Sequence, residues 1–169
     1  TATSVGDAGI QISAGQAFIF NNNITVLGVD TSTDKDTFST ILFDSTANEG
    51  SKIINNLLIM NSSINPSVYI NTGSSNKNFI NNTIKHNYRG FYINATTSVD
   101  ILNINMTNGS ITLCDIGTSC QDSNVDADVI ITRNVTNVFL TNVDLNKTRI
   151  KVLPYSNGVD KNNITVNWF

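Results

Sequence analysis

The chain has 169 residues and a net charge of −3, from 10 Lys and Arg against 13 Asp and Glu. This length suits one domain with a hydrophobic core, and we expect a single domain over residues 1–169, either alone or as a fragment or module of a longer protein. The cations are spread along the chain, which argues against a nucleic-acid partner. No run of 18 apolar residues occurs, so no membrane span is expected.

The composition favours an all-β fold. There are 27 Asn, 20 Thr and 16 Ser but a single Glu, Glu49. Strong helix formers are scarce, whereas Ile, Val, Thr and Phe are common, and these residues favour strands separated by polar turns.

Short apolar-x-apolar segments recur along the chain and predict strands that stack on one another. Their starts are separated by 31, 27, 23, 20 and 18 residues. A spacing near 20–25 residues is about one turn of a three-sided β-solenoid, in which stacking of the turns supplies the core. A β-sandwich of short strands is the structural alternative. In chain order the segments are Ile10–Ile12, Ile41–Phe43, Val68–Ile70, Phe91–Ile93, Ile111–Leu113 and Val129–Ile131.

An Asn-rich frame accompanies these strands. The segment from Asn81 to Ile93 reads Asn-Asn-x-Ile-x-x-Asn-x-x-Gly-apolar-x-apolar, and the segment that begins at Asn55 repeats its first half. Asn at a tight corner tolerates left-handed geometry, and Asn side chains stacked at one corner can bond to each other. We therefore expect ladders of Asn55 with Asn81 and of Asn61 with Asn87. Gly90 is expected to supply a turn conformation that a side chain would resist.

The Asn-Asn-x-Ile-x-x-Asn-x-x-Gly frame resembles the parallel β-helix repeat family of pectate-lyase-like architecture, over roughly residues 41–113. The Asn-rich stretch from Asn134 to Thr148 is similar in composition to archaeal cell-surface proteins that carry such repeats. The resemblance implies a right-handed parallel β-helix of about five to six short coils. It also implies a surface or extracellular filament protein.

Two further patterns are candidate sites. Cys114 and Cys120 enclose five residues, which favours a local disulfide and an oxidising compartment, with two free buried thiols as the alternative. Oxygen-bearing side chains alternate from residue 122 onward in a weak calcium pattern, for which an Asx-rich turn is the alternative. The calcium candidates are Asp122, Asn124, Asp126 and Asp128. No other metal and no cofactor are expected.

Nine Asn-x-Ser/Thr sequons are present, a small excess over the number expected from the composition. We expect N-linked glycans on several of them in a glycosylating host. Asn81 is set aside because a glycan would not fit a ladder position. The candidates are Asn23, Asn61, Asn94, Asn105, Asn108, Asn134, Asn146 and Asn163.

Proton-transfer chemistry is poorly represented. The segment that contains Lys85, His86, Tyr88 and Arg89 is the only such cluster, and it occupies one turn of one repeat. A carbohydrate-binding or polysaccharide-lyase-like protein is therefore the alternative function, with aromatic platforms at Tyr69, Tyr88, Tyr92 and Trp168.

The favoured function is structural and not enzymatic. The two ends of a solenoid expose unpaired backbone groups, so stacking end to end would build a polymer. We expect an extracellular or cell-surface protein that self-associates as a subunit or module of a filament, sheath or surface layer.

Overall fold

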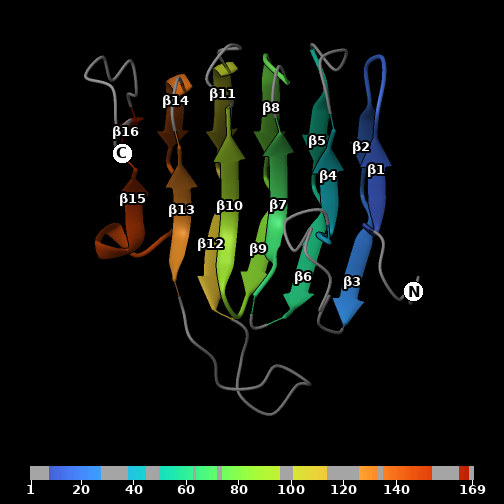
Figure 1. The fold of residues 1–169 in the computed structure, drawn as a ribbon, viewed down its shortest axis with the longest axis horizontal. Coiled ribbons are helices and arrows are strands. Elements are labelled where there is room, and N and C mark those ends of the chain that lie inside the picture. Colours follow the sequence, from blue (N-terminus) through green and yellow to red (C-terminus); the bar gives the residue numbers. More distant parts are fainter. Residues whose placement is uncertain are drawn as a thin grey trace.

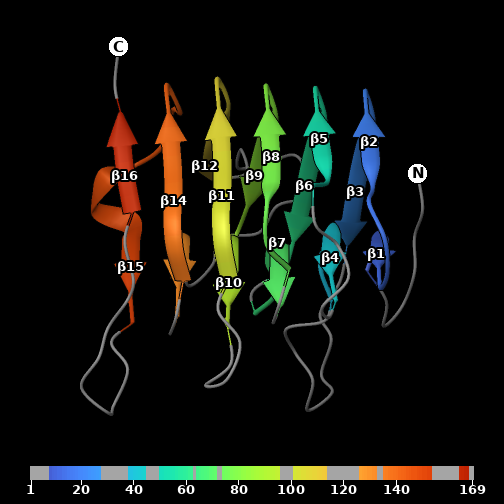
Figure 2. The ribbon, with the colours of Figure 1, turned by 90° about the horizontal axis from the view of Figure 1, so that it is seen from above.

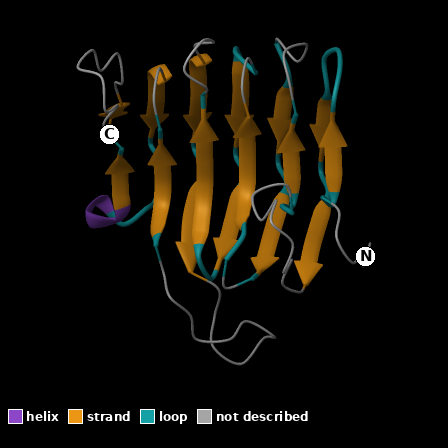
Figure 3. Ribbon diagram, viewed as in Figure 1, coloured by secondary structure: helices purple, strands orange, loops and turns teal. Residues whose placement is uncertain are grey.

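The computed structural model describes residues 8–27, 38–44, 50–62, 64–71, 74–95, 101–113, 126–132, 135–153 and 164–167. These residues form an all-β structure of sixteen strands and one short 3-10 helix, η1 (Lys147–Arg149) (Figure 3). Every strand pairing is parallel. A β-sandwich pairs its strands antiparallel, so the alternative fold is wrong for the described chain.

The strands form three parallel sheets, which we call A, B and C. Sheet A contains β1 (Ile10–Ile12), β4 (Ile41–Phe43), β7 (Pro66–Asn71), β10 (Arg89–Asn94), β13 (Ala127–Ile131) and β15 (Ile150–Val152). Sheet B contains β2 (Phe18–Phe20), β5 (Lys52–Ile54), β8 (Lys77–Ile80), β11 (Ile101–Thr107), β14 (Val135–Thr141) and β16 (Ile164–Asn167). Sheet C contains β3 (Asn23–Leu27), β6 (Leu57–Asn61), β9 (Thr83–His86) and β12 (Ser110–Leu113).

The chain visits sheets A, B and C in turn, and we call each such passage a circuit. Each strand therefore pairs with strands of the circuits before and after it, and the circuits follow one another along the molecule from β1 to β15 (Figures 1 and 2). This arrangement of stacked parallel sheets is compatible with a parallel β-helix.

The register in sheet A confirms most of the predicted strand stack. Ile10 pairs with Ile41, which pairs with Val68, and the column continues through Phe91 to Val129. All of these except Ile10 are buried within one continuous hydrophobic core. The apolar residues therefore recur because they lie above one another.

One predicted strand belongs to a different sheet. Ile111–Leu113 lies in β12 of sheet C, where Ile111 pairs with Ile84, so it does not follow Phe91 in the sheet A stack. The sheet A partner of Phe91 is Val129, and Ile150 then pairs with Val129. The short spacings of 20 and 18 residues in the sequence arose because two sheets were counted as one.

Candidate functional site

A column of exposed asparagines turns the chain at the end of the sheet B strands β2, β5, β8, β11 and β14. Each adopts a left-handed backbone with φ between 51° and 57°. The backbone N–H of each donates to a carbonyl of the following circuit, as from Asn55 to Ile80 at 3.0 Å and from Asn81 to Thr107 at 2.9 Å. Asn is one of the few residues that tolerates this conformation. The members are Asn21, Asn55, Asn81, Asn108 and Asn142.

The residues immediately after three of these corners form a side-chain ladder. Asn56 Oδ1 accepts from the backbone N–H of Asn22 at 2.9 Å, and Asn82 Oδ1 accepts from that of Asn56 at 2.9 Å. The amide groups also bond to each other, at 3.1 Å and 3.0 Å. Asn56 and Asn82 are 2% and 1% exposed. Asn22, at one end, is exposed. We call the three residues Asn22, Asn56 and Asn82 the buried ladder, after the burial of Asn56 and Asn82.

The predicted pair of Asn55 and Asn81 lies beside this ladder, and the predicted pair of Asn61 and Asn87 forms a contact at the other end of β6 and β9. Asn55 and Asn81 occupy equivalent corners, but the ladder bonds at this position are made by the next residue in each pair. Asn87 donates its side-chain amide to Asn61 Oδ1 at 2.5 Å. The Asn-Asn dipeptide carries both roles, since the first Asn turns the backbone while the second bonds inside.

Half-exposed and exposed asparagines also bond to each other across circuits, near the beginning of the sheet B strands β8, β11 and β14. Asn103 donates to Asn76 at 2.9 Å, and Asn137 donates to Asn103 at 3.0 Å. All three have positive φ values. Eight of the described asparagines thus form left-handed corners, and these recur from one circuit to the next.

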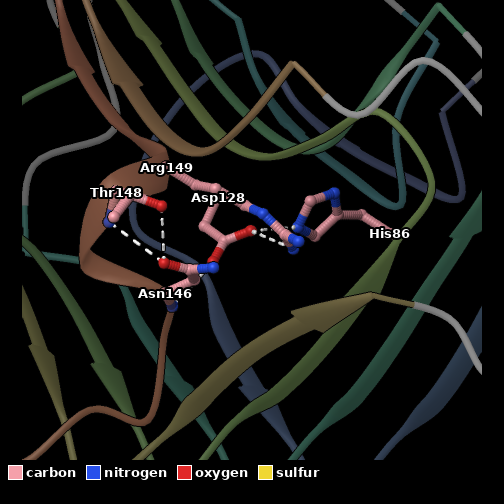
Figure 4. A network of polar contacts seen from close by, with 5 residues as sticks. All are labelled: His86, Asp128, Asn146, Thr148 and Arg149. Carbon is pink, nitrogen blue, oxygen red and sulfur yellow. Dashed lines mark hydrogen bonds and ion pairs between the residues drawn. The ribbon is translucent and has the colours of Figure 1, made fainter.

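A buried polar network joins sheet C to sheet A (Figure 4). His86 Nε2 lies 3.0 Å from Asp128 Oδ1, and the two side chains are 0% and 1% exposed. Asp128 Oδ2 accepts from the backbone N–H of Asn146 at 2.9 Å, and Arg149 lies 3.8 Å from Oδ1. Asn146 in turn caps η1 by accepting from the N–H of Thr148. When Asp128 is ionised, Nε2 carries the proton and donates it.

The Nδ1 atom of His86 is buried without a hydrogen-bond partner in the described part of the chain. His86 stands in an inward column of sheet C, between Met60 and the strand β12. The sequence gives no sign of the contact with Asp128, because 42 residues separate the two.

Gly90 makes room for this network and is not a left-handed turn residue. Among described glycines, only Gly15 and Gly50 have positive φ. A Cβ at Gly90 would lie 2.4 Å from Ile111 Cγ2, 2.5 Å from the Asp128 carbonyl oxygen and 3.2 Å from the His86 ring. The expectation of a special turn was therefore wrong, and the glycine serves close packing.

A second ion cluster lies nearer the surface. Arg89 donates to Asp126 Oδ2 at 2.7 Å, and Lys151 bonds to the other carboxylate oxygen. Burial raises the pKa of Asp126, but the hydrogen bonds and charges of Lys151 and Arg89 outweigh it and hold the pKa below 3.8. The Arg89 guanidinium also lies 4.5 Å from the Tyr88 ring and 4.9 Å from the Tyr92 ring.

Two of the four calcium candidates, Asp122 and Asn124, lie outside the described residues. The other two, Asp126 and Asp128, each face cationic or histidine side chains of the protein. The described residues hold no group of three or more His, Cys, Asp or Glu side chains suited to a metal ion.

Of the residues of the alternative function, Arg89 lies against the rings of Tyr88 and Tyr92, but His86 does not join them. His86 is fully buried, whereas the half-buried Arg89 binds Asp126. Tyr69 and Tyr92 stack on each other with ring centroids 5.2 Å apart, and Tyr69 is 4% exposed. A sugar platform needs an open ring face, which Tyr69 does not offer. Trp168 lies outside the described residues.

The sequons differ in how their asparagines are held. Asn23, Asn81, Asn108 and Asn146 are exposed, while Asn61, Asn94 and Asn105 are half-buried. Asn94 donates to the Tyr69 hydroxyl at 3.0 Å, and Asn105 donates to Asn78 at 3.1 Å. Asn81 is thus more open than its expected ladder role implied. The candidates Asn134 and Asn163, and the cysteines Cys114 and Cys120, lie outside the described residues.

An open pocket of about 390 Å³ lies beside β12, where sheet C gives way to η1. Its polar lining includes Asp128, Asp144, Asn146 and Arg149. Its opposite charges are partly matched within the protein by the contact between Arg149 and Asp128.

No protein-family model, curated protein or solved structure matches the chain. No helix among the described residues is long and apolar enough to cross a membrane.

Proposed function

We propose that the chain is a structural module of an extracellular or cell-surface filament, sheath or layer, glycosylated and self-associating through its two ends. Its fold in this proposal is a right-handed parallel β-helix of about six coils, since sheets A and B have six strands each. The hand follows from the rule that crossovers between parallel strands of one sheet are right-handed in about 98% of cases. This is the architecture that the Asn repeat resembles.

The distribution of exposed apolar side chains carries the proposal. The large hydrophobic residues that are most exposed belong to the first circuit or to the last two, and none belongs to a central circuit of the described chain. Exposed apolar side chains that gather in one place are typical of surfaces that a partner covers. They are Phe18, Phe20 and Leu27 near one end, and Phe139, Val152 and Leu153 near the other.

Charge and polarity support the same choice. The net charge of −3 gives little repulsion between copies. The one histidine of the chain is fully buried against Asp128, so it is poorly placed to accept a proton from a substrate. These features favour a structural protein over a lyase.

The test compares two matched double variants by sedimentation velocity and negative-stain electron microscopy. Phe18→Thr with Phe20→Thr removes apolar surface at the end strand β2. Ile54→Thr with Ile80→Thr removes apolar surface from the inner strands β5 and β8 instead. Both residues lie in the same column as Phe20. Thr keeps a high strand propensity.

The wild-type chain is expected to form elongated assemblies, the end variant to lose them and the inner variant to retain them. A wild-type chain that sediments as a monomer at high concentration would refute self-association. Equal loss in both double variants would refute the role of the ends.

A further inference from the structure

Sheet B ends in two edge strands, β2 and β16. β2 pairs only with β5, and β16 pairs only with β14, so each has one side without a strand partner among the described residues. The inference that follows rests on the proposed self-association and identifies the surfaces that form it.

The backbone of β2 shows which of its groups face outward. The Ala17 carbonyl accepts from the N–H of Lys52 at 2.9 Å, and the N–H of Asn21 donates to the Ile54 carbonyl at 3.1 Å. Successive residues of a parallel strand direct their N–H and C=O groups to opposite sides. The N–H and C=O of Phe18 and the N–H of Phe20 therefore point away from β5.

The backbone of β16 is open on the opposite side. The Asn167 carbonyl accepts from the N–H of Asn142 at 2.8 Å, so Asn167 faces β14. By the same alternation, the backbone groups of Ile164 and Val166 point away from β14. The two open edges thus offer complementary sets of donors and acceptors.

We propose that β16 of one copy pairs in parallel with β2 of a second copy, in the register already used between neighbouring strands of sheet B. The N–H of Phe18 then donates to the Ile164 carbonyl. The Val166 N–H donates to the Phe18 carbonyl, and the Val166 carbonyl accepts from the N–H of Phe20.

The side chains fit this register. Val166 continues the inward column of Ile53, Phe79, Met106 and Leu140, and Ile19 begins it. Val166 of one copy would thus contact Ile19 of the second. Thr165 would lie beside Phe18 on the outer face, because both belong to the outward column that includes Lys52.

A second copy is the occupant because neither described edge strand carries a residue that opposes pairing. Natural edge strands are commonly guarded by a charged residue or a proline. The strands Phe18–Phe20 and Ile164–Asn167 contain neither, whereas the inner strands β5 and β8 carry Lys52 and Lys77. Phe18 and Phe20 are also 56% and 44% exposed, which suits burial by another copy.

The first experiment removes the one backbone N–H of β16 that donates to β2 of the second copy in the proposed pairing. Val166→Pro removes the outward N–H and is compatible with an edge strand, while Val166→Ala shortens the side chain but keeps that N–H. Sedimentation velocity is expected to show only monomer for Val166→Pro and assemblies for Val166→Ala. Circular dichroism should show both folded. A folded Val166→Pro that assembles like the wild type would overturn the pairing.

The second experiment tests the register by oxidative cross-linking. Phe18→Cys with Thr165→Cys places the two Cα atoms about 4.8 Å apart across the proposed contact, within disulfide range. The control pair, Phe18→Cys with Asn167→Cys, is shifted by two residues, so its separation is about 8 Å and too long. Peptide mapping without reduction identifies the linked residues among the native cysteines.

A disulfide between copies in the first pair and not in the second would support the register. Assemblies that link only through the control pair, or through neither, would overturn the register while leaving self-association intact. A wild-type chain that never assembles would instead refute the proposed function together with this inference.

Discussion

The buried ladder gives the sharpest test of how asparagine holds the circuits together. In Asn82→Ala, the side chain no longer accepts from the Asn56 backbone N–H or side-chain amide, and no longer donates to the Ile53 carbonyl at 2.8 Å. The Asn56 side chain stays satisfied, because it also donates to the carbonyls of Ile19 and Ile54. The backbone N–H of Asn56, which donates to Asn82 Oδ1 in the wild type, is left buried without this acceptor.

The expected loss follows from these contacts. A buried, unpaired N–H costs about 2 kcal/mol, and the two remaining bonds contribute about 1 kcal/mol each, so the free energy of unfolding should fall by about 4 kcal/mol. Asn22→Ala is the matched control at the exposed end of the ladder. It removes only the bonds from its side-chain amide to Asn56 and Phe20, for a loss of about 1 kcal/mol.

Urea denaturation followed by circular dichroism, at a dilution where the protein is monomeric, measures both losses. Asn82→Ala should unfold at a clearly lower urea concentration than Asn22→Ala, with a similar dependence on urea. If the two variants differ by less than about 1 kcal/mol, the ladder contributes little to stability and the reasoning fails.

Three further outcomes are expected. Gly90→Ala should lower the free energy of unfolding by about 2–3 kcal/mol, because its Cβ would lie 2.4 Å from a methyl group of Ile111. Gly15→Ala is the control: its φ is 74° but the space around it is open, so the loss should be about 1 kcal/mol. Urea denaturation measures both losses. The lowered pKa of Asp126 means that its ionised carboxylate stabilises the fold above pH 3.8, and this stabilisation is lost as pH falls through the pKa of the folded state. The wild type should therefore be more stable than Asp126→Asn above pH 3.8 and lose that difference below it. Urea midpoints measured across pH test this. After expression in a glycosylating host, a larger fraction of Asn146 than of Asn105 should carry a glycan, because Asn146 is exposed whereas the Asn105 amide bonds to Asn78. Peptide mapping measures both fractions. The reverse order would contradict the view that exposure decides which sequons are glycosylated.

Much of the fold was predictable because buried apolar residues recur at similar intervals along the sequence. Ile41, Val68 and Phe91 share a column, and the apolar-x-apolar pattern marks each of them. The pattern does not distinguish one sheet from another, which is why Ile111 was placed with Phe91 although it belongs to sheet C. Three sheets of similar short strands produce the same local signal.

The polar contacts were less predictable for a different reason. The Asn-Asn pairs were evident, but only the corner geometry shows that Asn82 turns inward while Asn81 stays exposed. The contact of His86 with Asp128 depends on how two sheets meet and on the missing side chain of Gly90. Such a contact leaves no periodic trace in the sequence.

The buried ladder stops after Asn82, where Gly109 occupies the equivalent position and a Cβ would lie 2.8 Å from the Asn82 carbonyl oxygen. Among the described residues, this ladder therefore links only the first three circuits. In a stack whose stability is a sum of neighbour contacts, partial opening should start where such links are missing. Amide hydrogen exchange should accordingly be slowest around β5 and β8 and faster toward β15, which would make the molecule stiff at one end and compliant at the other.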